Sequence, residues 1–334
     1  MDRVLVTGIS GFIASHVAAK LLDQGYQVRG TVRNLNKGQR IIEALKSAGH
    51  ATDNLELVEA DLNSDKGWPE AVKGCRYIQH IASPFPLETP NDREALVPAA
   101  RAGAQRVLEN GFSAGAERIV MTSSMISMAG QPNRPKHFIV TESDWTDPDW
   151  APLQAYAVSK ARAEISAWAY VESQGLKDRF VTVNPGAVLG PDLFDNGGAS
   201  LEMIQMFLDR EMPMMPKVSY PIVDVRDCAA IHVAAMTKPE ASGRRLMAAG
   251  QTLWIKDIAD VIRAEYPQMK GLPKVVAPNW LLRIVAKFDK RLKIIVADLG
   301  IFQEADSGYV TTLTGVVPRF AKEAVLASVE SLRR

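Results

Sequence analysis

Tyr156 and Lys160 are the residues of this chain whose types and spacing best suit chemistry. Residues four apart on a helix lie above one another on the same face, so the phenol and the ammonium would point into one site. A phenol with an ordinary pKa of about 10 is a poor acid at neutral pH, and a neighbouring cation favours its ionised form. The pair therefore suits the donation of a proton to a carbonyl oxygen whose carbon receives a hydride.

The segment around this pair is typical of an uninterrupted helix. Residues 157–164 contain no helix breaker and place apolar side chains on one side. Tyr266 and Lys270 have the same spacing, but Pro267 pushes the tyrosine before it out of the helical region. The first pair is therefore the stronger candidate.

Composition sets the broad class of the protein. The chain has 334 residues, of which 47% are hydrophobic and 23% are charged, as in one large soluble domain or a large and a small one. A net charge of +1 argues against a nucleic-acid partner or an anionic membrane. No run of 18 apolar residues occurs, and no apolar segment typical of a signal peptide follows Met1, so we expect neither a spanning helix nor a leader.

Metal and disulfide chemistry are not expected. Cys75 and Cys228 are the only two cysteines, and the five histidines show no ligand spacing. We expect no metal and a reducing, cytoplasmic location.

The first 32 residues predict a nucleotide-binding unit. Residues 4–7 are typical of a buried strand, Gly8, Gly11 and Ala14 of a tight turn into a helix, and residues 26–32 of a second strand. A glycine turn at this place lets the backbone approach a pyrophosphate at the positive end of the helix dipole. The alternative is a tight turn that needs small residues and binds nothing.

The second strand indicates which dinucleotide binds. NAD-binding units usually carry an acidic residue about 20 positions after the glycines, but residues 24–42 contain none. Arg33 instead falls just after the strand, where a guanidinium could hold a 2′-phosphate. We predict NADP(H), the alternative being a solvated basic loop.

Further strands are expected to end in polar groups at the same edge of the sheet. Asp61 ends a strand over residues 55–62 and could accept a hydrogen bond from an adenine amino group or cap the next helix. Ser124 ends the strand at 118–124 and would lie near Tyr156. His80 is expected to be a core histidine.

Seven segments together resemble the extended short-chain dehydrogenases/reductases. The similarity is to the dihydroflavonol reductase-like group, which includes fungal ketone and methylglyoxal reductases and bacterial carbonyl reductases. The segments are VTGISGFIA (residues 6–14), TVRN (31–34), HIASPF (80–85), MTSS (121–124), AYAVSK (155–160), NPGAVLGP (184–191) and VDVRD (223–227).

The resemblance implies a fold and a set of residue roles. The fold would be α/β, a doubly wound parallel Rossmann sheet with a smaller, mostly C-terminal substrate domain. Ser124 would polarise the carbonyl, Tyr156 would donate the proton, and Lys160 would lower the tyrosine pKa and hold the nicotinamide ribose. Arg33 and, more weakly, Lys37 would select the 2′-phosphate. The expected cofactor-binding residues are Thr7, Gly8, Ser10, Gly11, Phe12, Ile13, Arg33, Lys37, Asp61, Leu62, Ala82, Ser83, Tyr156, Lys160, Pro185 and Val188.

The remaining segments predict a substrate side. We expect residues 1–191 and 223–250 to form the dinucleotide-binding domain, and residues 192–222 and 251–334 the substrate domain. Methionines are frequent between 203 and 215, and methionine fills irregular apolar space. The predicted pocket has one wall with Met203 and Phe207 and an opposite wall with Phe85 and Met125; plain helix packing is the alternative.

These patterns predict an NADPH-dependent reductase of a neutral ketone or aldehyde with a hydrophobic or aromatic body. The partner would be this small molecule, and the protein a monomer or homodimer. One alternative is an NAD-dependent nucleotide-sugar epimerase or dehydratase, which usually has the acidic residue missing here. Another is a non-enzymatic NADP(H)-binding sensor, which typically lacks the Tyr/Lys pair.

Overall fold

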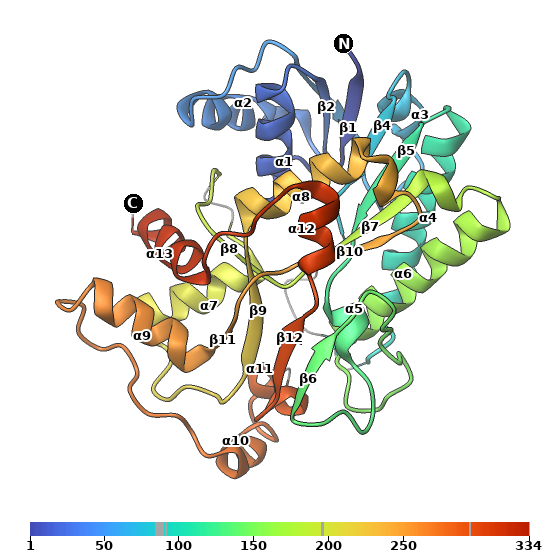
Figure 1. Ribbon diagram of the computed structural model, residues 1–334. Helices are drawn as coiled ribbons and strands as arrows, with labels where there is room; N and C mark the ends of the chain where they lie inside the picture. Colours follow the sequence, from blue (N-terminus) through green and yellow to red (C-terminus); the bar gives the residue numbers. More distant parts are fainter. Residues whose placement is uncertain (84–89, 91, 195–196, 294, 334) are drawn as a thin grey trace.

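Seven short apolar segments form one parallel sheet at the centre of the protein (Figure 1). The computed structural model describes residues 1–83, 90, 92–194, 197–293 and 295–333. Strands buried on both faces are near-continuous apolar runs, and most of these segments have that character; β3, at the edge of the sheet, has Glu56 and Glu59 exposed. The strands are β1 (Arg3–Val6), β2 (Gln27–Val32), β3 (Leu55–Glu59), β4 (Tyr77–His80), β5 (Arg118–Thr122), β7 (Phe180–Pro185) and β10 (Arg245–Ala248).

The order of these strands is β3-β2-β1-β4-β5-β7-β10, and every neighbouring pair is parallel. This is the order of a doubly wound dinucleotide-binding sheet, with its switch point between β1 and β4. The predicted fold class is confirmed.

Helices cover both faces of the sheet (Figure 1). One face packs against α1 (Phe12–Asp23), α2 (Gly38–Ser47) and α8 (Val225–Thr237). The other packs against α3 (Trp68–Val72), α4 (Val97–Ser113) and α6 (Ala155–Ser173). On this second face Trp168 and Phe180 meet edge to face, with their ring centres 4.7 Å apart.

Two smaller sheets extend the structure below the main one in Figure 1. Strands β8 (Ala187–Leu189), β9 (Ser219–Asp224) and β11 (Thr252–Trp254) form one in the order β11-β9-β8, and β6 (His137–Val140) pairs in parallel with β12 (Phe302–Ala305). The remaining elements are η1 (Leu35–Lys37), α5 (Ile126–Ala129), η2 (Lys177–Arg179), α7 (Ala199–Leu208), η3 (Pro239–Ala241), α9 (Ile255–Glu265), α10 (Asn279–Val285), α11 (Lys290–Lys293), η4 (Val296–Asp298), α12 (Gly308–Thr314) and α13 (Ala321–Leu332).

A second hydrophobic core holds this lower part together. Leu201 and Ile204 of α7, Ile258 of α9 and Val325 of α13 are all fully buried in it. Helix α13 also supplies two buried hydroxyls to the chain after β8: Ser328 Oγ accepts from Gly190 N at 2.7 Å, and Ser331 Oγ accepts from Asp192 N at 2.8 Å.

The predicted domain boundaries stay a prediction, and the strand pairings cross them. Strand β9 runs across the expected boundary at residues 222 and 223, and β6 of the expected first domain pairs with β12 of the expected second one.

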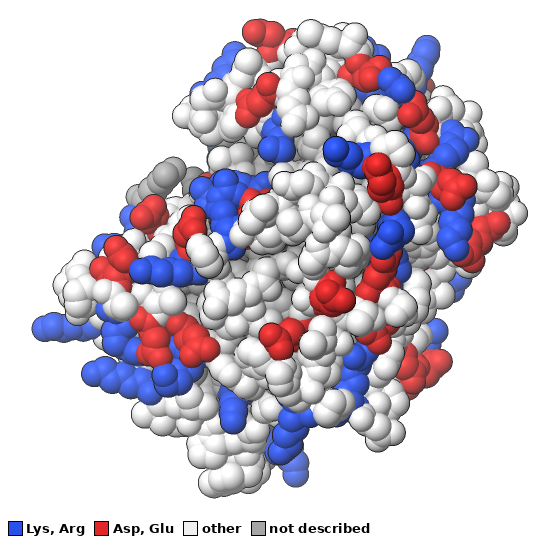
Figure 2. Space-filling view, in the orientation of Figure 1, with Lys and Arg blue, Asp and Glu red and all other residues white. Residues whose placement is uncertain are grey.

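Positive and negative charges are mixed on the face of the molecule that Figure 2 displays. Figure 2 shows Lys and Arg interspersed with Asp and Glu over the face it displays, a pattern that offers no basic stripe for a nucleic-acid backbone. Within the described residues, no helix is long and apolar enough to cross a membrane. Cys75 and Cys228 are both buried and free.

The contact between Trp168 and Phe180 allows a test of the core. Phe180→Ala removes a ring that is 0% exposed, so we expect the free energy of unfolding to fall by about 3–5 kcal/mol. Urea denaturation measures it. Phe288→Ala is the control, because that ring is 86% exposed, and a similar loss in both variants would contradict the assignment of Phe180 to the core.

Candidate functional site

A cavity of about 860 Å³ opens where the strands of the main sheet end. Its lining comes from the turns after β1, β2, β3, β4, β5 and β7, because parallel strands bring all their carboxyl ends to one edge. The predicted residues that line it are Gly8, Ser10, Gly11, Phe12, Ile13, Arg33, Asp61, Leu62, Ala82, Ser83, Ser124, Tyr156, Lys160, Pro185 and Val188.

The turn after β1 brings bare backbone to the cavity. Gly8 has φ +62°, a left-handed conformation that favours glycine. A Cβ added at Gly8 would lie 2.9 Å from the Cβ of Ala82. The turn can therefore approach the chain after β4 this closely only because Gly8 has no side chain. Helix α1 begins next to Gly11 with no side chain capping its first N–H groups. The turn therefore fits an anionic pyrophosphate, which these N–H groups and the helix dipole favour.

Thr7 braces this turn from behind. It is fully buried, and its hydroxyl oxygen accepts from the N–H groups of Ile81 and Ala82, both at 3.0 Å. Its hydroxyl hydrogen is then available to His80 Nδ1 at 3.1 Å, which assigns the ring proton to Nε2. Burial, with a smaller effect of Lys160, lowers the pKa of His80 to about 3, so the ring is neutral, as expected of a core histidine.

Arg33 and Asp61 both line the cavity, after β2 and β3. Arg33 is exposed just after β2, and no carboxylate within the described part of the chain pairs with it. Asp61 Oδ1 accepts from the N–H of Asn63 at 2.9 Å and therefore closes a local turn, while Asp61 also lines the cavity. Lys37 ends η1, and its side chain lies outside the described residues.

Tyr156 and Lys160 share one face of α6, as predicted. The Lys160 Nζ lies 5.9 Å from the centre of the Tyr156 ring. Both side chains are partly exposed to the cavity but enclosed by protein, and this desolvation disfavours charge on each of them. It raises the pKa of Tyr156 to about 12 and lowers the pKa of Lys160 to about 8.

The direction of the tyrosine shift differs from the one expected from sequence. The cause of the rise is the cost of burying the phenolate, and Lys160 is not among its causes. The phenol consequently keeps its proton at neutral pH, which is the form that an acid needs.

Ser124 is held at the cavity by the backbone around it. The neighbouring N–H groups of Ser123 and Met125 donate to the carbonyls of Val183 at 2.7 Å and Pro185 at 2.9 Å. The Ser124 hydroxyl oxygen accepts from the N–H of Ile126 at 3.2 Å, which leaves its hydrogen available to a ligand in the cavity.

The predicted substrate wall stays a prediction, and its described residues lie in hydrophobic clusters. Phe207 is 1% exposed in the second core, and Met203 packs against the same core. Met125 is buried with Met128 in another hydrophobic cluster, and Phe85 lies outside the described residues. The apolar character of these residues predicts that their side chains are buried. It does not predict whether they face the cavity or a hydrophobic core, because both places require apolar side chains.

Other lining residues were not predicted from sequence. Among them are Leu96 and Ala99 at the start of α4, and Gly197, Gly198 and Ser200 at the start of α7. Two consecutive glycines directly before a helix resemble the glycine turn before α1, and this pattern could have indicated the lining residues at the start of α7. Within the described residues, no group of His, Cys, Asp or Glu could hold a metal ion.

Comparison with known proteins gives the family. A family model described as the NAD dependent epimerase/dehydratase family matches residues 4–249, which include every predicted catalytic residue. The chain belongs to this family. The resemblance to extended short-chain dehydrogenases/reductases is thereby confirmed.

Several similar proteins are reductases by name. The chain is 34% identical to cinnamoyl-CoA reductase 1 of Petunia hybrida over 79% of this chain and 78% of that protein. It is 31% identical to ketoreductase azaE of Aspergillus niger over 86% of this chain and 89% of that protein. Gre2 of Candida albicans, solved with NADPH, superposes with a TM-score of 0.81 at 27% identity, covering 100% of this chain and 99% of the other.

Gly8 gives a test of the turn. Gly8→Ala adds backbone strain and a contact with Ala82, so we expect the free energy of unfolding to fall by more than the roughly 1–2 kcal/mol of a left-handed alanine. Gly49→Ala is the control, since Gly49 has φ +91° with nothing within 4 Å of the added Cβ. Thermal and urea denaturation of both variants measure the difference. Equal losses would show that close packing at Gly8 contributes nothing.

Proposed function

We propose that the protein reduces a ketone or aldehyde to an alcohol with NADPH. One observation carries the proposal: Ser124, Tyr156 and Lys160 line the same cavity as the glycine turn and Arg33. A proton donor with its cation therefore shares a space with the groups suited to a 2′-phosphorylated dinucleotide.

The cavity has groups for each part of the cofactor. The N–H groups at the start of α1 would hold the pyrophosphate, and Arg33 the 2′-phosphate. Lys160 would hold the nicotinamide ribose, with Pro185 and Val188 beside the ring. When bound, NADPH supplies a hydride to the carbonyl carbon.

The chain's own residues would handle the oxygen of the substrate. Ser124 donates a hydrogen bond to the carbonyl oxygen and fixes its direction. Tyr156 donates its proton to the same oxygen as negative charge develops there. Lys160, with its ammonium close by, stabilises the phenolate that remains until a solvent proton replaces the one transferred.

The substrate class follows from the lining and the relatives. Apolar side chains such as Phe12, Ile13 and Leu96 line the cavity, which suits a neutral substrate with a hydrophobic or aromatic body. The names of the relatives, cinnamoyl-CoA reductase and ketoreductase, support carbonyl reduction in the same family.

Nucleotide-sugar epimerisation, which the family name also includes, fits this chain less well. Arg33 stands after β2, where an acidic residue would favour retained NAD. A sensor without catalysis would have no use for a buried Tyr/Lys pair. Purified protein without bound NAD, and NADPH consumption with a carbonyl panel, would support the reductase over both alternatives.

Tyr156→Phe tests the proton donor. The variant keeps the ring and loses the acidic hydroxyl, so we expect kcat for carbonyl reduction to fall by about 10²- to 10⁴-fold with NADPH affinity little changed. NADPH absorbance and a fluorescence titration measure the two quantities. Tyr170→Phe on the same helix is the control and should keep wild-type kcat. Unchanged turnover in Tyr156→Phe would remove this residue from its role.

Arg33→Ala tests cofactor selection. Loss of a charge-assisted contact of about 1.5–3 kcal/mol should raise KM for NADPH by roughly 10- to 100-fold and leave KM for NADH nearly unchanged. Arg40→Ala is the matched control, because Arg40 is an exposed α2 arginine outside the cavity lining. An equal rise for both cofactors would refute selection of the phosphate by Arg33.

A further inference from the structure

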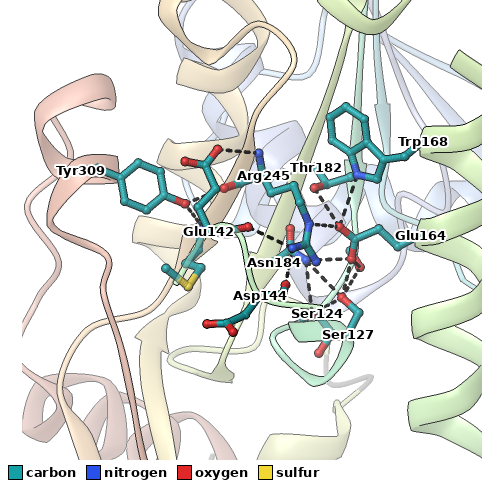
Figure 3. A network of polar contacts seen from close by, with 12 residues as sticks. Ser124, Ser127, Glu142, Asp144, Glu164, Trp168, Thr182, Asn184, Arg245 and Tyr309 are labelled. Atoms are coloured by element: carbon teal, nitrogen blue, oxygen red, sulfur yellow. Dashed lines mark hydrogen bonds and ion pairs between the residues drawn. The ribbon is translucent and has the colours of Figure 1, made fainter. Parts of the chain in front are cut away.

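Glu164 is a fully buried carboxylate one helical turn after Lys160, and Figure 3 shows the polar groups that converge on it. Its Oε1 accepts from Arg245 Nε at 2.7 Å, Thr182 Oγ1 at 3.2 Å and Trp168 Nε1 at 3.4 Å. Its Oε2 accepts from Asn184 Nδ2 at 2.9 Å and lies within hydrogen-bond distance of the hydroxyls of two serines, Ser123 and Ser127. A carboxylate that accepts hydrogen bonds from this many donors is an ionised one, so Glu164 acts here as an anion.

Arg245 is the counter-ion, and its position is fixed independently of Glu164. Its side chain is 7% exposed. Nη1 donates to the carbonyls of Glu142 at 3.0 Å and Asp144 at 2.5 Å, and the guanidinium stacks 3.6 Å above the ring of Trp145. The ion pair therefore links α6 to β10 deep inside the protein.

The same carboxylate reaches the loop that carries Ser124. Ser127 Oγ lies 2.6 Å from the Ser124 carbonyl oxygen, and Asn184 Nδ2 lies 3.3 Å from it. Ser127 has one hydroxyl hydrogen, which Glu164 and this carbonyl share between them. Glu164 therefore reaches the Ser124 backbone through two shared donors, Ser127 and Asn184.

Lys160, one helical turn before Glu164 on α6, lies close to the same carboxylate. Both line a small cavity of about 20 Å³, together with His80, Thr122 and Ser123. Opposite charges attract strongly in such a low-dielectric space. Burial lowers the pKa of Lys160, and Glu164 opposes that fall. Among the described residues, the titratable groups facing Lys160 are neutral His80 from β4 and Tyr156 and Glu164 from α6.

We propose that the Glu164 carboxylate, held from one side by Arg245, positions the catalytic groups: it supports the ammonium of Lys160 and holds the loop of Ser124 in place. Glu164 is a positioning residue, since it acts through Lys160 and Ser124. The catalytic part of this inference rests on the proposed function of those two residues.

Glu164→Gln tests the charge with little change of shape. Without the anion, and with Arg245 left unpaired, we expect the pKa of Lys160 to fall by about one unit. Competitive acetylation of the cofactor-free protein across pH, read by mass spectrometry at Lys160, measures this pKa without any activity. Glu172→Gln is the matched control, because Glu172 is an exposed carboxylate on the same helix, paired with Lys177. It should leave the Lys160 pKa unchanged.

Arg245→Met separates charge from structural damage. It breaks the same ion pair but leaves Glu164 with its remaining donors, so the Lys160 pKa should stay at or above the wild-type value. An equal fall in both variants, or no fall in Glu164→Gln, would overturn the inference. Should Glu164→Gln not fold, the double variant E164Q/R245M leaves no buried charge unpaired, and its Lys160 pKa should still fall; an unchanged value there would also overturn it.

Activity gives a second readout that separates this inference from the proposed function. In carbonyl reduction, the loss of kcat/KM at alkaline pH should move to lower pH by about one unit in Glu164→Gln and not in Glu172→Gln. A wild-type protein that reduces no carbonyl would refute the proposed function, while the acetylation result would still decide whether Glu164 supports the charge of Lys160.

Discussion

The common direction of the seven strands is the constraint on which the site depends. Because every neighbouring pair is parallel, each strand must end at the same edge, and each following turn contributes to one cavity. The glycine turn, Arg33 and Ser124 are far apart in sequence but meet there. Helix α6 packs on one face of this sheet and adds Tyr156 and Lys160 from the side.

Helix α6 also spaces three ionisable groups by successive turns, and burial acts differently on each. Burial raises the pKa of Tyr156, so the phenol stays neutral, and it lowers the pKa of Lys160 to about 8. Glu164 is surrounded by hydrogen-bond donors. Burial makes each of these charges costly unless a partner offsets it. The ion pair with Arg245 therefore connects the stability of the interior to the chemistry at the cavity.

Sequence predicted those parts of the site that depend on short-range spacing. Gly8, Arg33, Ser124 and Tyr156 each sit in a local pattern of a strand, a turn or a helix, and each lines the cavity. The first strand–helix–strand unit followed from the distinct periods of strands and helices, whereas the fold class as a whole was implied by the resemblance of seven motif segments to a known family.

The parts that sequence could not predict depend on distant partners. Glu164 carries no local signal, since its counter-ion lies 81 residues further along the chain. Phe207 was expected at the pocket and lies in the second core, because residue type does not distinguish two apolar surroundings. The pairing of β6 with β12 joins segments with no shared motif, and the rise in the tyrosine pKa depends on burial that only packing defines.

The two serine hydroxyls of α13 have a consequence for how the protein is made. The N–H groups of Gly190 and Asp192 are completed only by Ser328 and Ser331, and the chain beyond them supplies part of the cavity wall at Gly197 and Gly198. Translation proceeds from the N-terminus, so the dinucleotide-binding strands can pair while these two groups still lack their acceptors. The segment that leads to this wall therefore gains its last two hydrogen bonds only once α13 has been synthesised and has packed against it.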